Sequence, residues 1–211
     1  MAATVVFDLG GVVLNWRPDE LLLTNLPDRL QSHDQALVLA ADFFESFRPG
    51  GAWAEFDRGV LSIDEVAGQI AARTSLPYDA VMAVMHGIPA HLQLRLDTAD
   101  LLVELRAAGH RLVFLSNMPA PFIEHVQSQL DSLGVFERGI YSSDIKLIKP
   151  EDRIFTLALE TFACHAADCV FLDDNATNVA AASGAGWQAL QFTDAAQARR
   201  ELLARGLLID D

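Results

Sequence analysis

Short apolar runs that alternate with helix-like segments constrain the fold of this chain more than any other feature. The runs cover residues 4–7, 111–115, 169–172 and 186–192, with a weaker candidate at residues 139–142. Apolar runs of this length, bounded by polar residues, are typical of buried strands. Strands that alternate with helices form parallel sheets with right-handed crossovers. The sequence therefore predicts an α/β fold with a Rossmann-like parallel sheet.

The long segment after the first strand interrupts this alternation. Pro18 suits the first position of a helix, and Ser62 and Glu65 have the spacing of a capping box. Apolar residues that include Leu37 and Val38 predict an amphipathic helix over residues 31–47, and Pro77 is expected to start another that runs to about His86. Residues 16–91 contain no convincing strand. We therefore expect an all-helical cap subdomain at residues 16–91, inserted into an α/β core of residues 1–15 and 92–211. An insertion at this edge of the sheet is a natural lid.

The charge and hydropathy of the chain limit its partners. The 211 residues include 15 Lys and Arg against 29 Asp and Glu, which gives a net charge of −14. Such an acidic chain is a poor partner for nucleic acid or for an anionic membrane surface. No apolar run reaches the ~18 residues that predict a membrane span, and no signal-like segment precedes the first strand. We expect a cytoplasmic monomer or homodimer that acts on a small molecule.

Polar residues follow the predicted strands directly. They are Asp8 after the first strand, Ser116 and Asn117 after the second, and Asp173 and Asp174 after residues 169–172. The carboxyl ends of parallel strands share one edge of the sheet, where open α/β sheets bind ligands. Carboxylates brought together there repel one another unless a cation lies among them, and oxygen ligands suit Mg²⁺.

Lys149 and the glycines after Asp8 add a second element to this edge. A lysine, a hydroxyl, an amide and the N–H groups of a glycine turn can hold a phosphate beside a metal ion. Taken singly, each residue has an ordinary explanation, such as a turn, a helix cap or a surface lysine. The combination predicts a phosphate and metal site.

Four stretches, in this order, resemble the four motifs of the haloacid dehalogenase superfamily. They are Phe7-Asp8-Leu9-Gly10-Gly11-Val12, Leu115-Ser116-Asn117, Lys149-Pro150 and Leu172-Asp173-Asp174-Asn175. The helical insertion is similar to the C1-type cap of that superfamily. The Asp-Leu-Gly-Gly and Asp-Asp-Asn variants look like the sugar-phosphate phosphatase branch, similar to glucose-1-phosphate phosphatases.

The resemblance implies a mechanism and a metal. Asp8 is then the nucleophile, which forms an aspartyl-phosphate that water hydrolyses. Mg²⁺ is bound by the Asp8 carboxylate, the Gly10 carbonyl and Asp174, with Asp173 as an outer or weaker ligand.

The resemblance also implies how the phosphoryl group is held. The backbone N–H groups of Leu9, Gly10 and Asn117 and the hydroxyl of Ser116 bind its oxygens. Lys149 balances the charge of the nucleophile and of the transferring group.

One position departs from the family pattern. Most phosphatases of the superfamily have a second Asp two residues after the nucleophile, as general acid and then base, and here Gly10 stands there. General acid help is typically worth ~10²–10⁴-fold, so acidic leaving groups such as a sugar 1-phosphate are favoured. A cap residue or water could supply the proton. Asp57 and Glu55 are candidates, although solvated helix charges are the more common explanation for such residues.

Substrate choice is expected to come from the cap, at Trp53, Phe56, Asp57 and Arg58. An aromatic face suits a sugar ring, although such residues are more often helix core. Two alternatives to a phosphatase stay open. One is a metal-independent 2-haloacid dehalogenase, which is compatible with Gly10 but not with a cluster of acids beside an anionic substrate. The other is a non-catalytic phosphate-binding module.

Overall fold

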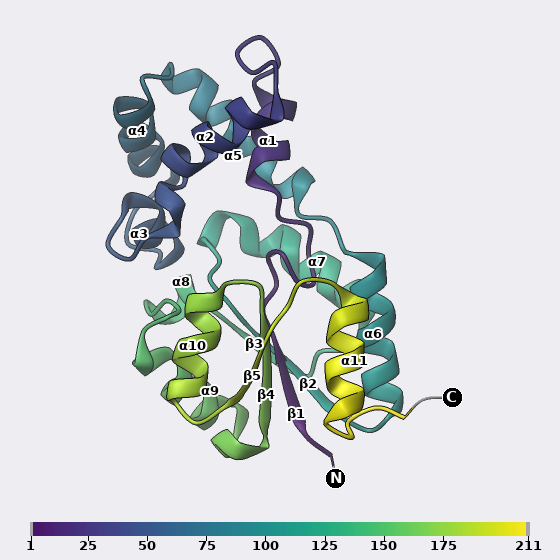
Figure 1. The fold of residues 1–211 in the computed structure, drawn as a ribbon. Helices are drawn as coiled ribbons and strands as arrows, with labels where there is room; N and C mark the ends of the chain where they lie inside the picture. The colour runs from purple at the N-terminus through teal and green to yellow at the C-terminus, as the bar shows by residue number, and fades with distance from the viewer. Residues whose placement is uncertain (1, 210–211) are drawn as a thin grey trace.

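A five-stranded, all-parallel sheet forms the lower part of the molecule in Figure 1. The computed structural model describes residues 2–209, so residues 1 and 210–211 of the predicted core lie outside it. The strand order is β3-β2-β1-β4-β5. The strands are β1 Thr4–Phe7, β2 Arg111–Ser116, β3 Arg138–Tyr141, β4 Cys169–Asp173 and β5 Gln188–Gln191. The predicted α/β fold with a parallel sheet is confirmed, and the weakest strand candidate forms the edge strand β3.

The first strand occupies the centre of the sheet. Phe7 pairs in register with Phe114 of β2 on one side and with Leu172 of β4 on the other. The next pair out is Phe114 with Gly139 of β3. A Cβ atom on Gly139 would lie only 2.0 Å from the Phe114 ring, so the glycine makes room for this ring.

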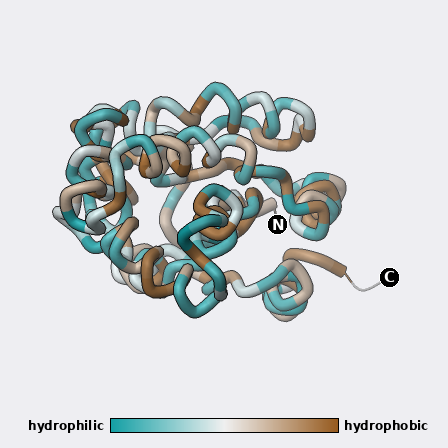
Figure 2. Tube along the Cα trace, turned by 90° about the horizontal axis from the view of Figure 1, so that it is seen from above, coloured by the Kyte–Doolittle hydropathy of each residue, from teal (hydrophilic) through white to brown (hydrophobic). Residues whose placement is uncertain are grey.

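Helices cover both faces of the sheet, and alternate residues of each strand serve each face. Val5 and Phe7 pack with the cluster that includes α6 Leu96–Ala107, α7 Ile123–Leu133 and α11 Ala195–Ala204. Val6 packs with the cluster that includes α9 Asp152–Phe162 and α10 Ala176–Gly184. Figure 2 shows brown and teal alternating along the helices, as amphipathic helices require.

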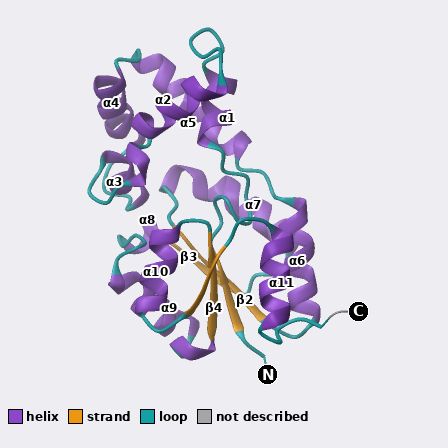
Figure 3. Cartoon of the chain, viewed as in Figure 1, coloured by secondary structure: helices purple, strands orange, loops and turns teal. Residues whose placement is uncertain are grey.

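Residues 18–91, here called the helical unit, stand above the carboxyl edge of the sheet and contain no strand in the described chain (Figure 3). The unit comprises α1 Pro18–Asn25, α2 His33–Phe43, α3 Ala52–Asp57, α4 Ile63–Thr74 and α5 Tyr78–His91. The two connections to the core lie side by side, since the Asn15 N–H donates to Gln93 O at 2.7 Å and the Arg95 N–H to Val13 O at 2.9 Å.

Two helix boundaries in this unit differ from the sequence patterns. A helix was expected over residues 31–47, with Leu37 and Val38 on its apolar face. The helix is present as α2, but it ends at Phe43, and Leu37 and Val38 are 48% and 72% exposed rather than on an apolar face. The chain turns there so that Phe44 packs against the ring of Trp53, with centroids 4.6 Å apart.

The other boundary is the end of α5, which runs to His91 rather than stopping near His86. Gly87 lies inside this helix and lets α1 approach. A Cβ atom there would lie 2.5 Å from Asn25 Oδ1.

The remaining elements are short. They are α8 Ser142–Ile145 and the 3₁₀ turns Glu45–Phe47, Ala120–Phe122 and Ala166–Asp168. None of the helices within residues 2–209 has the length and apolarity that a membrane span needs.

Candidate active site

Three carboxylates meet where the sheet reverses its strand order, between β1 and β4. Asp8 follows β1 and its N–H donates to Leu172 O of β4 at 2.8 Å, while Asp173 ends β4 and Asp174 follows it. One carboxylate oxygen from each aspartate lies within 4.8 Å of those of the other two. This is the crevice in which open α/β sheets bind ligands.

A buried lysine links two of these carboxylates. Lys149 Nζ lies 2.8 Å from Asp8 Oδ1 and 2.6 Å from Asp173 Oδ2, and the residue is 3% exposed. The side chain of Asn117 fixes the backbone there, since it accepts from the Lys149 N–H at 2.8 Å and donates to Lys149 O at 3.0 Å. The Lys149–Pro150 peptide bond is cis. Asn117 therefore positions the lysine through its side chain.

Asp173 and Asp174 are adjacent but occupy different environments. Asp173 is fully buried and accepts hydrogen bonds from Lys149, from the Asn175 N–H at 2.8 Å and from Asn178 Nδ2 at 3.1 Å. Asp174 is more exposed and lies against the turn after Asp8. A Cβ atom on Gly11, whose φ is +77°, would be 2.4 Å from Asp174 Oδ2. Gly11 therefore lets the two loops meet.

Electrostatics at this cluster favour a bound cation. Burial raises the pKa of Asp8 to about 7; repulsion from Asp173 and Asp174 adds to this shift, and attraction to Lys149 opposes it. Desolvation and repulsion from Asp173 raise the pKa of Asp174 to about 6. Burial opposes the charge of Lys149, but attraction to Asp173 and Asp8 keeps its pKa above the usual range. The single positive charge of Lys149 does not balance the negative charges of three carboxylates. The carboxylate oxygens are ligands that suit a hard divalent ion.

The sequence-predicted residues divide between the cavity and its support. Those that line one common cavity are Asp8, Gly10, Asn117, Lys149 and Asp174. The Leu9 N–H donates to Asp8 Oδ1 at 2.7 Å. Ser116 Oγ is buried at the end of β2 and has no hydrogen-bond partner within residues 2–209. Its hydroxyl group is therefore able to donate a hydrogen bond to a bound ligand.

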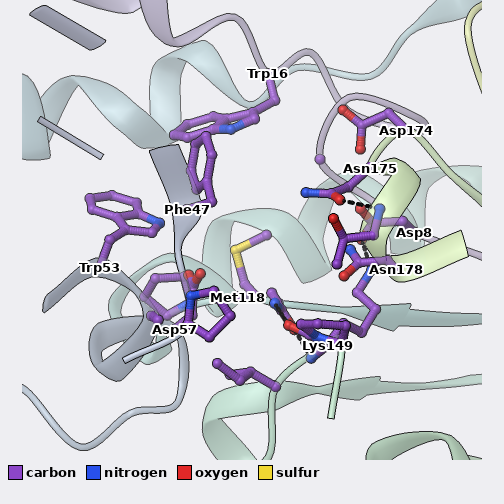
Figure 4. Close-up of a pocket in the computed structure, with 18 of the residues that line it drawn as sticks. Asp8, Trp16, Phe47, Trp53, Asp57, Met118, Lys149, Asp174, Asn175 and Asn178 are labelled. Atoms are coloured by element: carbon purple, nitrogen blue, oxygen red, sulfur yellow. Dashed lines mark hydrogen bonds and ion pairs between the residues drawn. The ribbon is translucent and has the colours of Figure 1, made fainter. Parts of the chain in front are cut away.

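The cavity has a volume of about 270 Å³, and most of its upper wall comes from the helical unit. Trp16, Phe47 and Trp53 gather on one side of it, opposite Asp8 and Asp174 (Figure 4). Further apolar lining comes from Ile88, Leu92, Met118 and Phe122. The side of the cavity opposite the carboxylates is therefore largely aromatic, while Asn175, Thr177 and Asn178 add polar lining.

The four residues expected to select the substrate do not all lie in the cavity wall. Trp53 and Asp57 line the cavity. Phe56 packs edge-on against Phe122, with ring centroids 5.8 Å apart. Arg58 pairs with Glu151 of the core at 2.6 Å, so Phe56 and Arg58 hold α3 against the core.

Asp57 is the one acidic residue of the helical unit in this cavity wall. It is 7% exposed, and no hydrogen bond or ion pair joins its carboxyl group to another described residue. Burial and repulsion from Asp8 raise its pKa well above the usual value, against attraction to Lys149.

Sequence patterns did not single out Asn178, Glu151 or Ser142. Asn178 lies one turn into α10, where residue 175 caps the helix, so its amide faces back to Asp173. That spacing was available in the sequence. The roles of Glu151 and Ser142 depend on contacts with α3, across more than 80 residues, and no local signal marks them.

Comparison with known proteins relates this chain to hydrolases of one family. The sequence profile of the haloacid dehalogenase-like hydrolases matches residues 2–186. A sesquiterpene phosphatase from Aspergillus oryzae is 25% identical over 198 residues, which is 93% of each chain. An (S)-2-haloacid dehalogenase from Pseudomonas putida is 32% identical over 97 residues, and this match covers 46% of the present chain and 43% of the dehalogenase.

A solved structure shares the fold. It is a family enzyme from Bacteroides thetaiotaomicron in complex with magnesium and inorganic phosphate. It superimposes with a TM-score of 0.67 at 20% sequence identity, over 92% of this chain and 96% of that one.

Proposed function

The chain belongs to the haloacid dehalogenase-like hydrolase family, and we propose that it is a Mg²⁺-dependent phosphomonoester hydrolase that acts through an aspartyl-phosphate on Asp8. The observation that carries this proposal is the cluster of Asp8, Asp173 and Asp174 around one buried lysine, at the edge of a cavity. We further propose that residues 16–91 act as a C1-type cap, and that the protein works in the cytoplasm as a monomer or homodimer.

The residues present fit a magnesium ion. Burial raises the pKa values of Asp8 and Asp174, repulsion among the aspartates adds to the shift, and Lys149 opposes it. Asp8 and Asp174 and the Gly10 carbonyl are the proposed ligands. Asp173 is engaged by Lys149, the Asn175 N–H and Asn178, which assigns it an outer, positioning part. Bound Mg²⁺ supplies charge neutralisation, so that Asp8 stays ionised beside an anionic phosphoryl group. The Bacteroides relative with magnesium and phosphate supports this choice.

The chain's own residues bind and orient the phosphoryl group. Lys149 and the Leu9 N–H hold Asp8 Oδ1 at 2.8 and 2.7 Å, and no described residue donates to Oδ2. The carboxylate is thus fixed by one oxygen and has the other free to react. The unsatisfied Ser116 hydroxyl and the Asn117 N–H are the proposed donors to the phosphoryl oxygens. Positioning of this kind supplies most of the catalysis of phosphoryl transfer.

The substrate class follows from the wall opposite Asp8. A sugar 1-phosphate, expected from the family resemblance, needs partners for several hydroxyl groups. The wall opposite Asp8 offers the rings of Trp16, Phe47 and Trp53, and the helical unit adds the polar side chains of Ser46, Arg48 and Asp57. We therefore propose a small phosphate ester whose organic part is largely apolar or aromatic. The sesquiterpene phosphatase relative is in keeping with such a substrate.

Dehalogenation is the second candidate, since relatives of that activity match part of the chain. It would use Asp8 on carbon, with a carboxylate substrate and no metal. Three aspartates against Lys149 repel such an anion when no divalent ion is present. The acidic cluster therefore favours phosphoryl transfer.

Hydrolysis of para-nitrophenyl phosphate with Mg²⁺, and then with EDTA, tests this proposal. We expect turnover with Mg²⁺ and its loss on chelation. Halide release from (S)-2-chloropropionate is measured in parallel, in EDTA. Halide release combined with phosphatase activity that is indifferent to EDTA would overturn the proposal.

A further inference from the structure

We propose that Asp57, delivered by α3 of the helical unit, is the general acid and base of the reaction, in place of the residue missing at Gly10. This inference rests on the proposed phosphatase function. It assigns the proton transfer to a side chain almost fifty residues from the nucleophile in sequence, on the opposite wall of the same cavity.

The position of Asp57 is the first argument. It is the last residue of α3, it lines the cavity that Asp8 and Lys149 also line, and it lies on the side of Trp53 in Figure 4. The organic part of a substrate whose phosphorus faces Asp8 must lie toward this wall. The ester oxygen, which takes the proton, lies between the two.

The isolation of the carboxyl group is the second argument. At 7% exposure, a carboxyl that only stabilised the fold would be expected to hydrogen-bond to the protein. The Asp57 carboxyl has no such partner among the described residues, and a substrate oxygen or a water molecule in the cavity can supply one. A buried polar group without a partner is costly, which makes a purely structural purpose a poor explanation.

The backbone of Asp57 is anchored to the core, which is the third argument. Ser142 Oγ donates to Asp57 O at 2.5 Å and accepts from the Met118 N–H at 2.9 Å. The next residue, Arg58, donates to Glu151 at 2.6 and 3.0 Å. These contacts fix the end of α3, and with it the Asp57 carboxyl group, relative to the strand ends.

The charges around Asp57 suit a proton donor. Burial and the negative charge of Asp8 raise its pKa, and Lys149 opposes the shift. The carboxyl group therefore holds its proton to a higher pH than an ordinary surface aspartate does, which favours a role as proton donor. Glu55, the other acidic residue of α3, pairs with Arg58 at 3.3 Å and does not line the cavity.

The proposed proton transfers balance over two steps. In the first, a carboxylate oxygen of Asp8 attacks phosphorus and the bond to the ester oxygen breaks. The ester oxygen keeps the electron pair, takes the proton of Asp57 and leaves as the alcohol. In the second, a water oxygen bonds to phosphorus as the Asp57 carboxylate takes a proton from that water, the bond between phosphorus and the Asp8 oxygen breaks with its electron pair left on Asp8, and phosphate leaves. Asp8 is again a carboxylate and Asp57 a carboxylic acid.

Leaving-group dependence in the variant Asp57→Asn tests the first step. The substrates are para-nitrophenyl phosphate, whose phenol needs no proton to leave, and 2-phenylethyl phosphate, whose alcohol does. We expect kcat/KM for the alkyl ester to fall by about 10²–10⁴-fold, and by far less for the aryl ester. The matched control, Glu55→Gln, neutralises a neighbouring acid on α3 and should leave the ratio of the two esters unchanged.

Accumulation of phosphorylated protein tests the second step. Without its base, Asp57→Asn should form the aspartyl-phosphate from para-nitrophenyl phosphate and hydrolyse it slowly. Rapid quenching should therefore show more phosphoryl group on Asp8 than in the wild-type protein, and nitrophenolate should appear as a burst. A residue that only supports the fold does not produce this signature.

A second variant keeps the proposal testable if the first is damaged. The atoms nearest to a Cβ atom on Gly10 belong to the Trp16 side chain, at 3.7 Å or more, which is ordinary contact, so an aspartate can be introduced there. Gly10→Asp in the Asp57→Asn background should restore alkyl ester turnover at least about 10-fold.

The outcomes separate the two proposals. A wild-type protein that hydrolyses neither ester with Mg²⁺ contradicts the phosphatase function itself. A wild-type protein that hydrolyses both, with an unchanged ester ratio and no phosphorylated protein in Asp57→Asn, overturns the role of Asp57 alone. An equal loss for both esters without rescue by Gly10→Asp also overturns it, because that pattern is structural damage.

Discussion

The two walls of the cavity differ in charge, in hydrogen bonding and in aromatic character. The floor, defined as Asp8, Lys149, Asp173 and Asp174 at the strand ends, is charged and tightly hydrogen-bonded. The roof, defined as Trp16, Phe47, Trp53 and Asp57, is aromatic, with one isolated carboxyl group. The floor suits one reacting group of fixed charge and shape. The roof suits a variable organic part and, in our proposal, provides the proton.

This difference indicates which wall acts on every substrate and which wall distinguishes one substrate from another. Charged groups in the floor are interdependent, since Lys149 contacts two carboxylates and each carboxylate raises the pKa of a neighbour. A change there should affect every substrate. Apolar contacts in the roof are closer to additive, so a change there should affect some substrates and spare others.

The largest effect is expected in the floor, at the nucleophile. Asp8→Asn keeps the shape of the side chain but lacks a nucleophilic oxygen anion, so turnover of all phosphate esters should fall by about 10⁴-fold or more. Initial rates with aryl and alkyl esters measure it. A loss confined to one ester would contradict the assignment of this wall to the common chemistry.

Lys149 is expected to have the next largest effect, on stability as well as activity. Lys149→Met leaves Asp8 and Asp173 buried without their cation, so the free energy of unfolding should fall by about 3–5 kcal/mol. Urea denaturation measures it. The matched control is Lys146→Met, because Lys146 is more exposed and donates only to Gly59 O, at 2.7 Å. Equal losses in the two variants would contradict the central place of Lys149.

Removal of a roof ring should have a smaller and selective effect. Phe47 is 40% exposed, so Phe47→Ala should fold normally. It removes an aromatic contact from the organic part of the substrate, and KM for para-nitrophenyl phosphate should rise about 10-fold. Acetyl phosphate, which is too small to reach this ring, should keep its kinetic constants. A parallel change for both substrates would abolish the distinction between roof and floor.

The smallest expected effect concerns pH and stability without metal. In the folded protein the pKa of Asp8 is raised from 3.8 to about 7, and that of Asp174 to about 6. At pH values between the unfolded and folded pKa of each group, the folded state binds more protons than the unfolded state. The free energy of unfolding therefore falls as the pH rises from about 4 to about 7.

Thermal unfolding in EDTA at pH 5 and pH 7 measures this, with Asp8→Asn as the reference for all other titrating groups. The melting temperature of the wild-type protein should drop by several degrees more than that of the variant, since about 1 kcal/mol moves it by roughly 2–4 °C. Mg²⁺ should reduce the excess drop. An excess rise would contradict the raised pKa values.

The floor could be predicted from sequence because its residues follow strands. Asp8, Ser116 and Asp173 each end or follow an apolar run, and the geometry of a parallel sheet brings such ends together. The capping box at Ser62 was equally local and is confirmed.

The roof could not be predicted to the same depth, because its arrangement depends on long-range packing. In the sequence, Asp57 resembles an ordinary helix charge. Its place in the cavity wall follows from the contacts of residues 57 and 58 with Ser142 and Glu151. The apolar spacing of residues 31–47 suggested one helix, whereas Phe44 and Phe47 turn toward Trp16 and end it early. Periodicity alone does not distinguish these outcomes.

The most direct measurement of the central claim is fluorine NMR of the protein with beryllium fluoride, which mimics a phosphoryl group on a carboxylate. We predict bound fluoride signals for the wild-type protein with Mg²⁺, and their loss in EDTA and in Asp8→Asn. Bound signals that persist in Asp8→Asn, or that never appear with Mg²⁺, would contradict the claim that Asp8 receives the phosphoryl group beside a metal ion.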